Sequence, residues 1–225
     1  PKRDESRVFG ENSLTMARRT RQRIGYLSET PIEDHGLPLS GLLRYYSSFF
    51  EAWDWKLVEA LTERMQVKTD RPLDDMSAGE RRRCELVLTL AHNPDLLVLD
   101  DPAVGLDATV RRDFLYTALE LARDEGKTIL FTSHVLHDVE RIVDSLAIMR
   151  EGKVCVQDDL DEILACTKRI VFRDGTSSSI ATVAGELSRE QRGRDLIVVT
   201  QGFDAAMERE LRPQASVEIE AMNLE

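Results

Sequence analysis

The chain has 225 residues, of which 42% are hydrophobic and 32% are charged. This composition supports one substantial domain with a buried core and a small appendage, and it excludes a disordered chain. The formal net charge of −11 argues against a large nucleic-acid footprint, so no nucleic-acid partner is expected. Two arginine clusters are expected on solvated helix faces: Arg18, Arg19, Arg21 and Arg23, and Arg81, Arg82 and Arg83.

No apolar run approaches the roughly 18 residues that a membrane-spanning helix requires. The charged start of the chain shows no signal-peptide pattern. Any contact with a membrane is therefore expected to come through a partner. The three cysteines, Cys84, Cys155 and Cys166, lie at no metal-ligand spacing. An odd number of cysteines without a disulfide framework indicates reduced thiols, and the expected compartment is the cytoplasm.

Short apolar runs alternate with longer helical stretches through the first two thirds of the chain. The expected strands are residues 7–9, 23–27, 96–99 and 128–131. The expected helices are residues 77–92, 108–125 and 135–143. The runs at 96–99 and 128–131 are typical of strands buried on both faces of a parallel sheet. This order of elements predicts an α/β domain with a mostly parallel sheet.

Between the second strand and residue 77 the pattern becomes helical, which predicts a helical insertion over residues 37–92. Residues 41–52 and 54–67 are expected to form two helices, and the second carries one apolar stripe: Leu57, Val58, Leu61 and Met65. Six large rings, including both tryptophans of the chain, gather here: Tyr45, Tyr46, Phe49, Phe50, Trp53 and Trp55. They are interpreted as a small core between helices, with a groove for a partner helix as the alternative.

The composition becomes more polar after residue 156. This predicts a boundary between an α/β domain of residues 1–157 and a C-terminal extension of residues 158–225. The strands expected in the extension are residues 169–172, 196–200 and 216–219, and the expected helices are residues 181–191 and 205–211. A small α+β appendage fits this pattern.

The strand at residues 96–99 runs directly into two carboxylates, Asp100 and Asp101. In α/β proteins the carboxyl edge of a parallel sheet is where ligands bind. The first carboxylate can hold Mg²⁺, and the second can orient or deprotonate a water molecule. Taken alone, the two residues fit an ordinary acidic turn after a strand equally well.

Three further patterns accompany the carboxylates: Ser77-Ala78-Gly79-Glu80 opens a helix, Gly105-Leu106-Asp107 follows the acidic turn, and Thr132-Ser133-His134 follows the next strand. The first is an S-x-x-E capping box, whose role can be purely structural. A helix start with free amides and a serine hydroxyl is equally a site for phosphate oxygens. A metal pair of His134 with His137 is not expected, because no third ligand is in view.

With these patterns in this order and spacing, the chain resembles the ABC ATPase family from about Val8 to Val156. Residues 96–101 match the Walker B strand, and residues 77–80 match the signature motif. Residues 105–107 match the D-loop, and His134 matches the switch histidine. The resemblance implies an α/β fold of the P-loop NTPase type that is incomplete at its N-terminus, with the helical insertion and the α+β extension added.

The resemblance also implies ATP and Mg²⁺ as ligands. Asp100 and Glu29 are then the expected metal-binding residues, and Asp101 and His134 the expected catalytic residues. The expected nucleotide contacts are Ser77, Ala78, Gly79, Glu80 and Asp107. Glu29 stands where the family has glutamine, so an anionic group replaces a neutral one beside the metal.

The function implied is that of an ATP-hydrolysing subunit that energises transport through an integral membrane partner. Its second partner is another ABC ATPase subunit, bound head to tail. The expected location is cytoplasmic, peripheral to the inner membrane through the membrane partner. The alternatives are a non-catalytic ABC-like module that donates its signature motif to a partner ATPase, and a soluble ABC protein that does not transport.

Three departures from the family pattern qualify this function. The 225 residues contain no G-x-x-x-x-G-K-[ST] loop, which indicates either a truncated product or a natural half-site. Asp101 replaces the usual glutamate, and its carboxylate reaches about 1.5 Å less far, so slower hydrolysis is expected. Ala78 and Glu80 replace glycine and glutamine but leave Ser77 and Gly79 in place.

Overall fold

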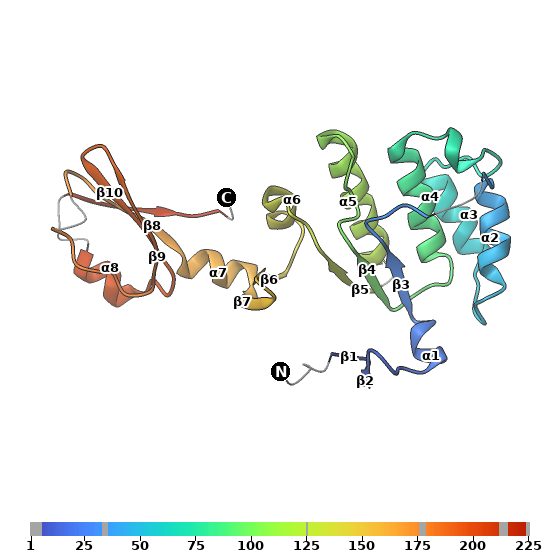
Figure 1. The fold of residues 1–225 in the computed structure, drawn as a ribbon, viewed down its shortest axis with the longest axis horizontal. Coiled ribbons are helices and arrows are strands. Elements are labelled where there is room, and N and C mark those ends of the chain that lie inside the picture. The colour runs from blue at the N-terminus through green and yellow to red at the C-terminus, as the bar shows by residue number, and fades with distance from the viewer. Residues whose placement is uncertain (1–5, 33–35, 125, 176–178, 212–215, 224–225) are drawn as a thin grey trace. The chain divides into compact units, whose positions relative to one another are not determined.

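The computed structural model describes residues 6–32, 36–124, 126–175, 179–211 and 216–223 (Figure 1). The chain forms two compact units, Pro1–His134 and Val135–Glu225. The sequence predicted a different kind of boundary, between an ATPase domain of residues 1–157 and an extension of residues 158–225. That functional division stays a prediction. Within the described residues, no helix combines the length and the apolar character needed to cross a bilayer.

A three-stranded parallel sheet lies at the centre of the first unit. β4 (Leu96–Leu99) pairs with β3 (Ile24–Leu27) on one side and with β5 (Thr128–Phe131) on the other. The register aligns the last residues of the three strands, Leu27, Leu99 and Phe131. The predicted parallel α/β class is therefore confirmed.

The two faces of this sheet differ in burial. On one face Leu27, Leu97 and Leu99 are at most 2% exposed. On the other face the register places Tyr26, Val98 and Leu130 side by side, and Tyr26 and Leu130 are more than half exposed. The prediction that these strands are buried on both faces is therefore wrong for the part of the unit that the structure describes, because its helices cover one face.

Helices α4 (Ala78–Leu90) and α5 (Ala108–Asp124) pack against one another in this unit. The buried side of α4 carries Leu86, Val87 and Leu90, all at most 2% exposed. α4 also lies close to β3, because a Cβ atom on Gly25 would come within 2.8 Å of the Thr89 carbonyl oxygen. Glycine at this position therefore permits the close approach of helix and strand.

The predicted helical insertion contains α2 (Leu39–Ser47), α3 (Trp55–Arg64) and the 3-10 turn Leu73–Asp75. Its core is apolar and well buried: Leu39, Leu42, Leu43, Val58, Leu61, Met65 and Leu73. Asp54 caps α3, since its Oδ1 accepts hydrogen bonds from the Lys56 and Leu57 amides at 2.9 and 3.1 Å. A short hairpin, β1 (Arg7–Val8) and β2 (Glu11–Asn12), and the helix α1 (Arg18–Arg21) precede β3.

The aromatic residues of the insertion form only part of a core. Phe50, which is half-buried, stacks on the buried His92 with ring centroids 4.1 Å apart. Tyr45, Phe49 and Trp55 are instead at least half exposed. The interpretation of all six rings as a core is therefore wrong for these three, which lie at the surface.

The second unit begins with α6 (Leu136–Glu140), the hairpin of β6 (Ser145–Arg150) and β7 (Lys153–Asp159), and α7 (Leu160–Cys166). A four-stranded antiparallel sheet follows in the order β11-β8-β10-β9. Its strands are β8 (Lys168–Phe172), β9 (Glu186–Arg192), β10 (Asp195–Thr200) and β11 (Val217–Ala221). Helix α8 (Ala205–Leu211) joins β10 to β11 and completes a core with Ile170, Phe172, Leu196 and Val198.

One predicted helix of this unit is wrong. Residues 186–191 of the expected helix 181–191 belong to β9, which pairs with β10. The segment carries good helix formers, but the backbone of β10 offers it a complete ladder of hydrogen bonds. Pairing with an existing sheet thus overrides local helix propensity. The helix predicted at residues 205–211 is confirmed.

A first prediction concerns the contact between α4 and α5. A Cβ atom on Gly79 would lie 2.7 Å from Cγ1 of Val110, so Gly79→Ala is expected to lower the free energy of unfolding by about 1–3 kcal/mol. Adding Val110→Ala removes the obstructing methyl group, so the double variant should lose less stability than the two single variants together. Urea unfolding measures all four chains, and strictly additive losses would refute the clash.

A second prediction concerns the thiols, all of which are free. Burial raises the pKa of Cys84 to about 12, whereas Cys155 is exposed. At about pH 8, a disulfide reagent should therefore modify Cys155 in the native chain and reach Cys84 at least about a hundredfold more slowly, since only the thiolate reacts. Absorbance of the released thiol follows both reactions. Equal rates for all three cysteines without denaturant would contradict this assignment.

Candidate functional site

The two carboxylates at the end of β4 are connected through one hydroxyl group. Oγ1 of Thr132 donates a hydrogen bond to Oδ1 of Asp100 at 2.8 Å and accepts one from the Asp101 amide at 2.9 Å. Thr132 directly follows β5, so the parallel pairing of β4 and β5 brings it beside the carboxylates. The hydroxyl therefore fixes the orientation of Asp100 and the backbone of Asp101 together.

Asp100 faces the open side of the sheet. Strand alternation places it on the same face as Val98 and Tyr26, and the Tyr26 hydroxyl lies 3.2 Å from its Oδ2. A ligand of Asp100 would therefore approach from the exposed row of Tyr26, Val98 and Leu130. Neither Tyr26 nor Thr132 was assigned a role from the sequence, although the alternation of strand side chains places Tyr26 on this face.

Asp101 and His134 form a hydrogen-bonded pair. Oδ2 of Asp101 lies 2.7 Å from Nδ1 of His134. Asp101 has a backbone φ of 39°, in the left-handed region that few side chains adopt. The side chain of Asp101 is 21% exposed, whereas that of His134 is 71% exposed. The imidazole of the pair is thus exposed to solvent, whereas the carboxylate that holds it is largely buried.

This geometry has a clear chemical capability. A carboxylate accepts hydrogen bonds only, so the Nδ1 atom that it contacts must carry the proton. The lone pair of His134 then lies on Nε2, at the exposed end of the ring. A carboxylate that orients an imidazole in this way prepares it to accept a proton from water or to bind a polar group.

Ser77 and Glu80 bind one another at the start of α4. The Glu80 amide donates to Oγ of Ser77 at 3.3 Å, and the Ser77 amide and hydroxyl donate to Oε2 of Glu80 at 2.9 and 2.8 Å. These hydrogen bonds from Ser77 hold the pKa of Glu80 below its ordinary value. The capping box is therefore present, and the Ser77 hydroxyl would have to exchange Glu80 for a phosphate oxygen to bind a nucleotide.

Two of the other expected nucleotide contacts begin the helix itself. Ala78 is the first residue of α4, and Gly79 follows it against Val110 of α5. Asp107 precedes α5, where its Oδ1 accepts hydrogen bonds from the Thr109 and Val110 amides at 3.1 Å. Gly79 and Asp107 thus both have structural roles that would explain their identity without a ligand.

The expected metal ligand Glu29 lies exposed in the segment that follows β3. Its carbonyl oxygen accepts a hydrogen bond from Nη2 of Arg82 at 2.9 Å, and the Ser28 carbonyl accepts one from Nη1 at 2.8 Å. Oε2 of Glu85 binds Nη1 of Arg82 at 2.7 Å, and its Oε1 accepts from the Ile32 amide at 3.0 Å. This clamp holds the Glu29 segment against α4.

Both side chains of the clamp are buried: Arg82 is 4% exposed and Glu85 is fully buried. The prediction that the cluster Arg81–Arg83 lies on a solvated face is therefore wrong for Arg82, which points into the fold to satisfy backbone carbonyls. The sequence could have indicated this ion pair, because Glu85 lies three residues after Arg82 on the same helix face.

The donors for a metal ion are few. Within the described residues, no group of three or more His, Cys, Asp or Glu side chains is arranged to hold a metal ion. Mg²⁺ in nucleotide sites uses one or two carboxylates together with phosphate oxygens and water. Asp100, oriented by Thr132, suits that role, and no protein cage is required.

Comparisons with known proteins agree on one family. The family model described as ABC transporter matches residues 2–104. The Nod factor export ATP-binding protein I of Ralstonia nicotianae is 31% identical over 162 residues, which are 70% of this chain and 50% of that protein. The protein of the same name from Burkholderia orbicola is 33% identical over 151 residues, 65% of this chain and 49% of that protein.

Solved structures share the fold. A structure described as the ATP binding subunit of an ABC transporter superposes with a TM-score of 0.61 at 24% identity, over 73% of this chain and 70% of that chain. CbiO1 of Clostridium perfringens superposes with a TM-score of 0.57 at 22% identity, over 64% and 60% of the two chains. The chain spans about half the length of the curated relatives that it matches. It belongs to the ABC transporter family of ATP-binding proteins.

Proposed function

We propose that this chain contributes the Walker B edge, the signature motif and the switch histidine to the ATPase of an ABC transporter. The observation that carries the proposal is the set of hydrogen bonds that joins Asp100, Thr132, Asp101 and His134 at the carboxyl edge of the parallel sheet. Carboxylates and an imidazole at this edge are the groups that phosphoryl transfer to water requires.

Each residue of this edge has its own role in the proposed reaction. Asp100 holds Mg²⁺, which when bound neutralises charge on the phosphate oxygens of ATP. Asp101 orients His134 through Nδ1, and Nε2 of His134 is free to contact the terminal phosphate or the attacking water. Glu29, held by its backbone to Arg82, offers a second carboxylate to the metal shell.

The phosphates of ATP also need a cradle of backbone amides. No G-x-x-x-x-G-K-[ST] loop occurs in the 225 residues, so we propose that polypeptide outside them supplies it. Ser77, Ala78, Gly79, Glu80 and Asp107 would contact the nucleotide held by a second ABC ATPase subunit. The membrane partner and the cytoplasmic, peripheral location follow from the transporter assignment. The relatives named for Nod factor export favour an export system.

A second candidate function is a non-catalytic module that donates its signature motif to a partner ATPase. The exposed capping box at Ser77 and Glu80, together with the loop missing from the 225 residues, favours it. Calorimetry of the purified chain with MgATP tests this second function in one direction, because absence of binding is compatible with both functions when the loop lies outside the 225 residues. Micromolar binding by the chain alone would exclude the non-catalytic module.

A third prediction tests the catalytic pair. The chain is joined behind the strand–loop–helix segment of the Ralstonia nicotianae relative, and phosphate release from ATP is measured. Asp101→Asn should lower kcat by at least about a hundredfold, because it removes the carboxylate that orients His134. The KM for ATP should change by less than about threefold, since a contact made only in the transition state is lost. Asp113→Asn, an exposed change on α5, is the matched control, and equal turnover in both variants would contradict the assignment.

A fourth prediction concerns the length of the same side chain. Asp101→Glu in the same fusion extends the carboxylate by about 1.5 Å and should raise kcat, because the carboxylate then reaches the attacking water directly. Turnover equal to or below that of the parent would show that the pairing of Asp101 with His134 already provides the full contribution of this position.

A further inference from the structure

The four-stranded sheet of the second unit is built from two crossover connections. β8 and β9 both pair antiparallel with β10, so they run parallel to one another, and the same reasoning makes β10 parallel to β11. Sheets of this split βαβ type usually carry a helix in each crossover. Here α8 fills the second crossover, whereas the described residues of the first, 173–175 and 179–185, form turns and extended chain.

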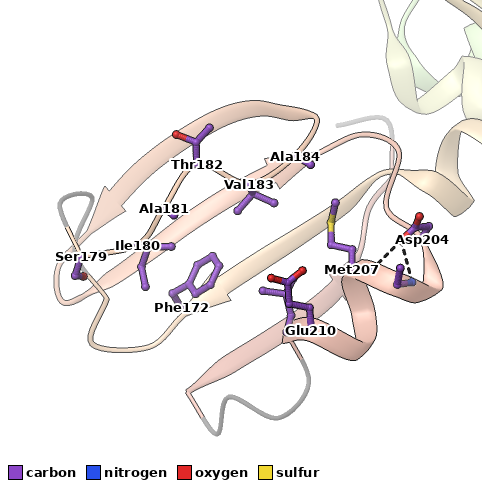
Figure 2. Close-up of a pocket in the computed structure, with 12 residues that line it drawn as sticks. Phe172, Ser179, Ile180, Ala181, Thr182, Val183, Ala184, Asp204, Met207 and Glu210 are labelled. Carbon is purple, nitrogen blue, oxygen red and sulfur yellow. Dashed lines mark hydrogen bonds between the residues drawn. The ribbon is translucent and has the colours of Figure 1, made fainter.

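A hollow of about 540 Å³ lies between that first crossover and α8 (Figure 2). Phe172 lies on the sheet side of the hollow, Ile180 and Val183 border it from the crossover, and Met207 borders it from α8. These residues belong to the hydrophobic core of the sheet or pack against it. A volume of this size is within the range of small-molecule sites, roughly 300–1,000 Å³.

The crossover residues that border the hollow are held in place by hydrogen bonds from side chains of β9 and β10. The Arg189 guanidinium donates to the Ile180 and Ala181 carbonyls at 3.0 and 3.1 Å, and it binds both carboxylate oxygens of Glu186 at 2.7 Å. The Thr200 hydroxyl donates to the Ala184 carbonyl at 2.5 Å. Arg189 holds the pKa of Glu186 down to about 2, so this ion pair persists at any pH used for binding experiments.

The end of the wall depends on a glycine. Gly185 has a φ of 67°, and a Cβ atom there would lie 1.9 Å from the Gln201 carbonyl oxygen. Its own carbonyl accepts a hydrogen bond from the Gln201 amide at 2.9 Å. Because the carbonyls of Ile180, Ala181 and Ala184 are hydrogen-bonded to β9 and β10, this stretch is held in place with Ile180 and Val183 bordering the hollow.

The charged side chains among the described lining residues are all acidic. Among the described residues that line the hollow, Asp204 and Glu210 are acidic, and none is Lys, Arg or His. Asp204 caps α8, since its Oδ1 accepts from the Ala206 and Met207 amides at 2.9 and 2.8 Å. Glu210 lies exposed in the last turn of α8, and its carboxylate lies at the rim of the hollow.

We propose that this hollow is a binding site for a small molecule with an apolar body and a cationic group. The apolar body would lie on Phe172, Val183 and Met207, and the cation would face the Glu210 carboxylate. The site belongs to the C-terminal unit alone, so it adds a ligand-responsive element to the chain and does not depend on nucleotide chemistry.

The test uses the full chain and three probes of one shape: 4-phenylbutylamine, the neutral 4-phenylbutan-1-ol and the anionic 5-phenylpentanoate. Methyl NMR should show shifts at Ile180, Val183 and Met207 with the amine. Calorimetry should show the amine binding about two- to fivefold more tightly than the alcohol, the advantage of one exposed ion pair. The anion should bind most weakly.

Variants separate the apolar and the charged contributions. Val183→Trp fills the hollow and should weaken both the amine and the alcohol at least about tenfold. Glu210→Gln should remove the preference for the amine and leave the alcohol unchanged, whereas Glu208→Gln, on the same helix but outside the hollow, should keep it. If Val183→Trp does not fold, the methyl shifts of the unaltered chain decide. Shifts elsewhere, no binding, or an amine preference that survives Glu210→Gln would each overturn the proposal.

Discussion

Parallel pairing of three four-residue strands is the constraint on which the candidate site depends. The site draws its residues from three stretches of sequence that are far apart: Tyr26, Asp100 with Asp101, and Thr132 with His134. Only the register of β3, β4 and β5 brings the carboxyl ends of these strands to one edge. The buried pair Arg82 and Glu85 then fixes the segment that leaves β3, through carbonyls and an amide of its backbone. An edge built in this way is pre-organised, because its polar groups are oriented before any ligand arrives.

Several residues at this site have two physical explanations at once. Ser77 and Glu80 complete a capping box, Gly79 makes room for Val110, and Asp107 caps α5. Each of these roles stabilises the fold of the isolated chain. The same groups lie at helix starts, where free amides favour anions, so a nucleotide presented by a partner would compete with Glu80 for the Ser77 hydroxyl. Residue identity alone therefore does not separate the structural role from the binding role.

The sequence predicted the parts of the fold that depend on local pattern. The ends of β4 before Asp100 and of β5 before His134, the stripe of α3 and the cap at Ser77 all follow from spacing, and the structure bears out their positions. Three features depend on contacts between distant segments, so local pattern did not predict them. β9 forms because β10 lies beside it, and Arg82 is buried because it satisfies the carbonyls of Ser28 and Glu29. Tyr26 reaches Asp100 from the neighbouring strand. The open face of the sheet was missed because an apolar run looks the same whether one or both of its faces are covered.

The most direct test of the central claim is the proton position on His134. Long-range proton–nitrogen NMR of the chain in mildly alkaline buffer distinguishes which ring nitrogen of His134 carries the proton. The Asp101 carboxylate at Nδ1 requires the proton on that nitrogen and an unprotonated Nε2. A His134 spectrum of this form supports the catalytic pair. A proton on Nε2 would show that Asp101 does not hold the ring, and the proposed role of this edge in hydrolysis would be wrong.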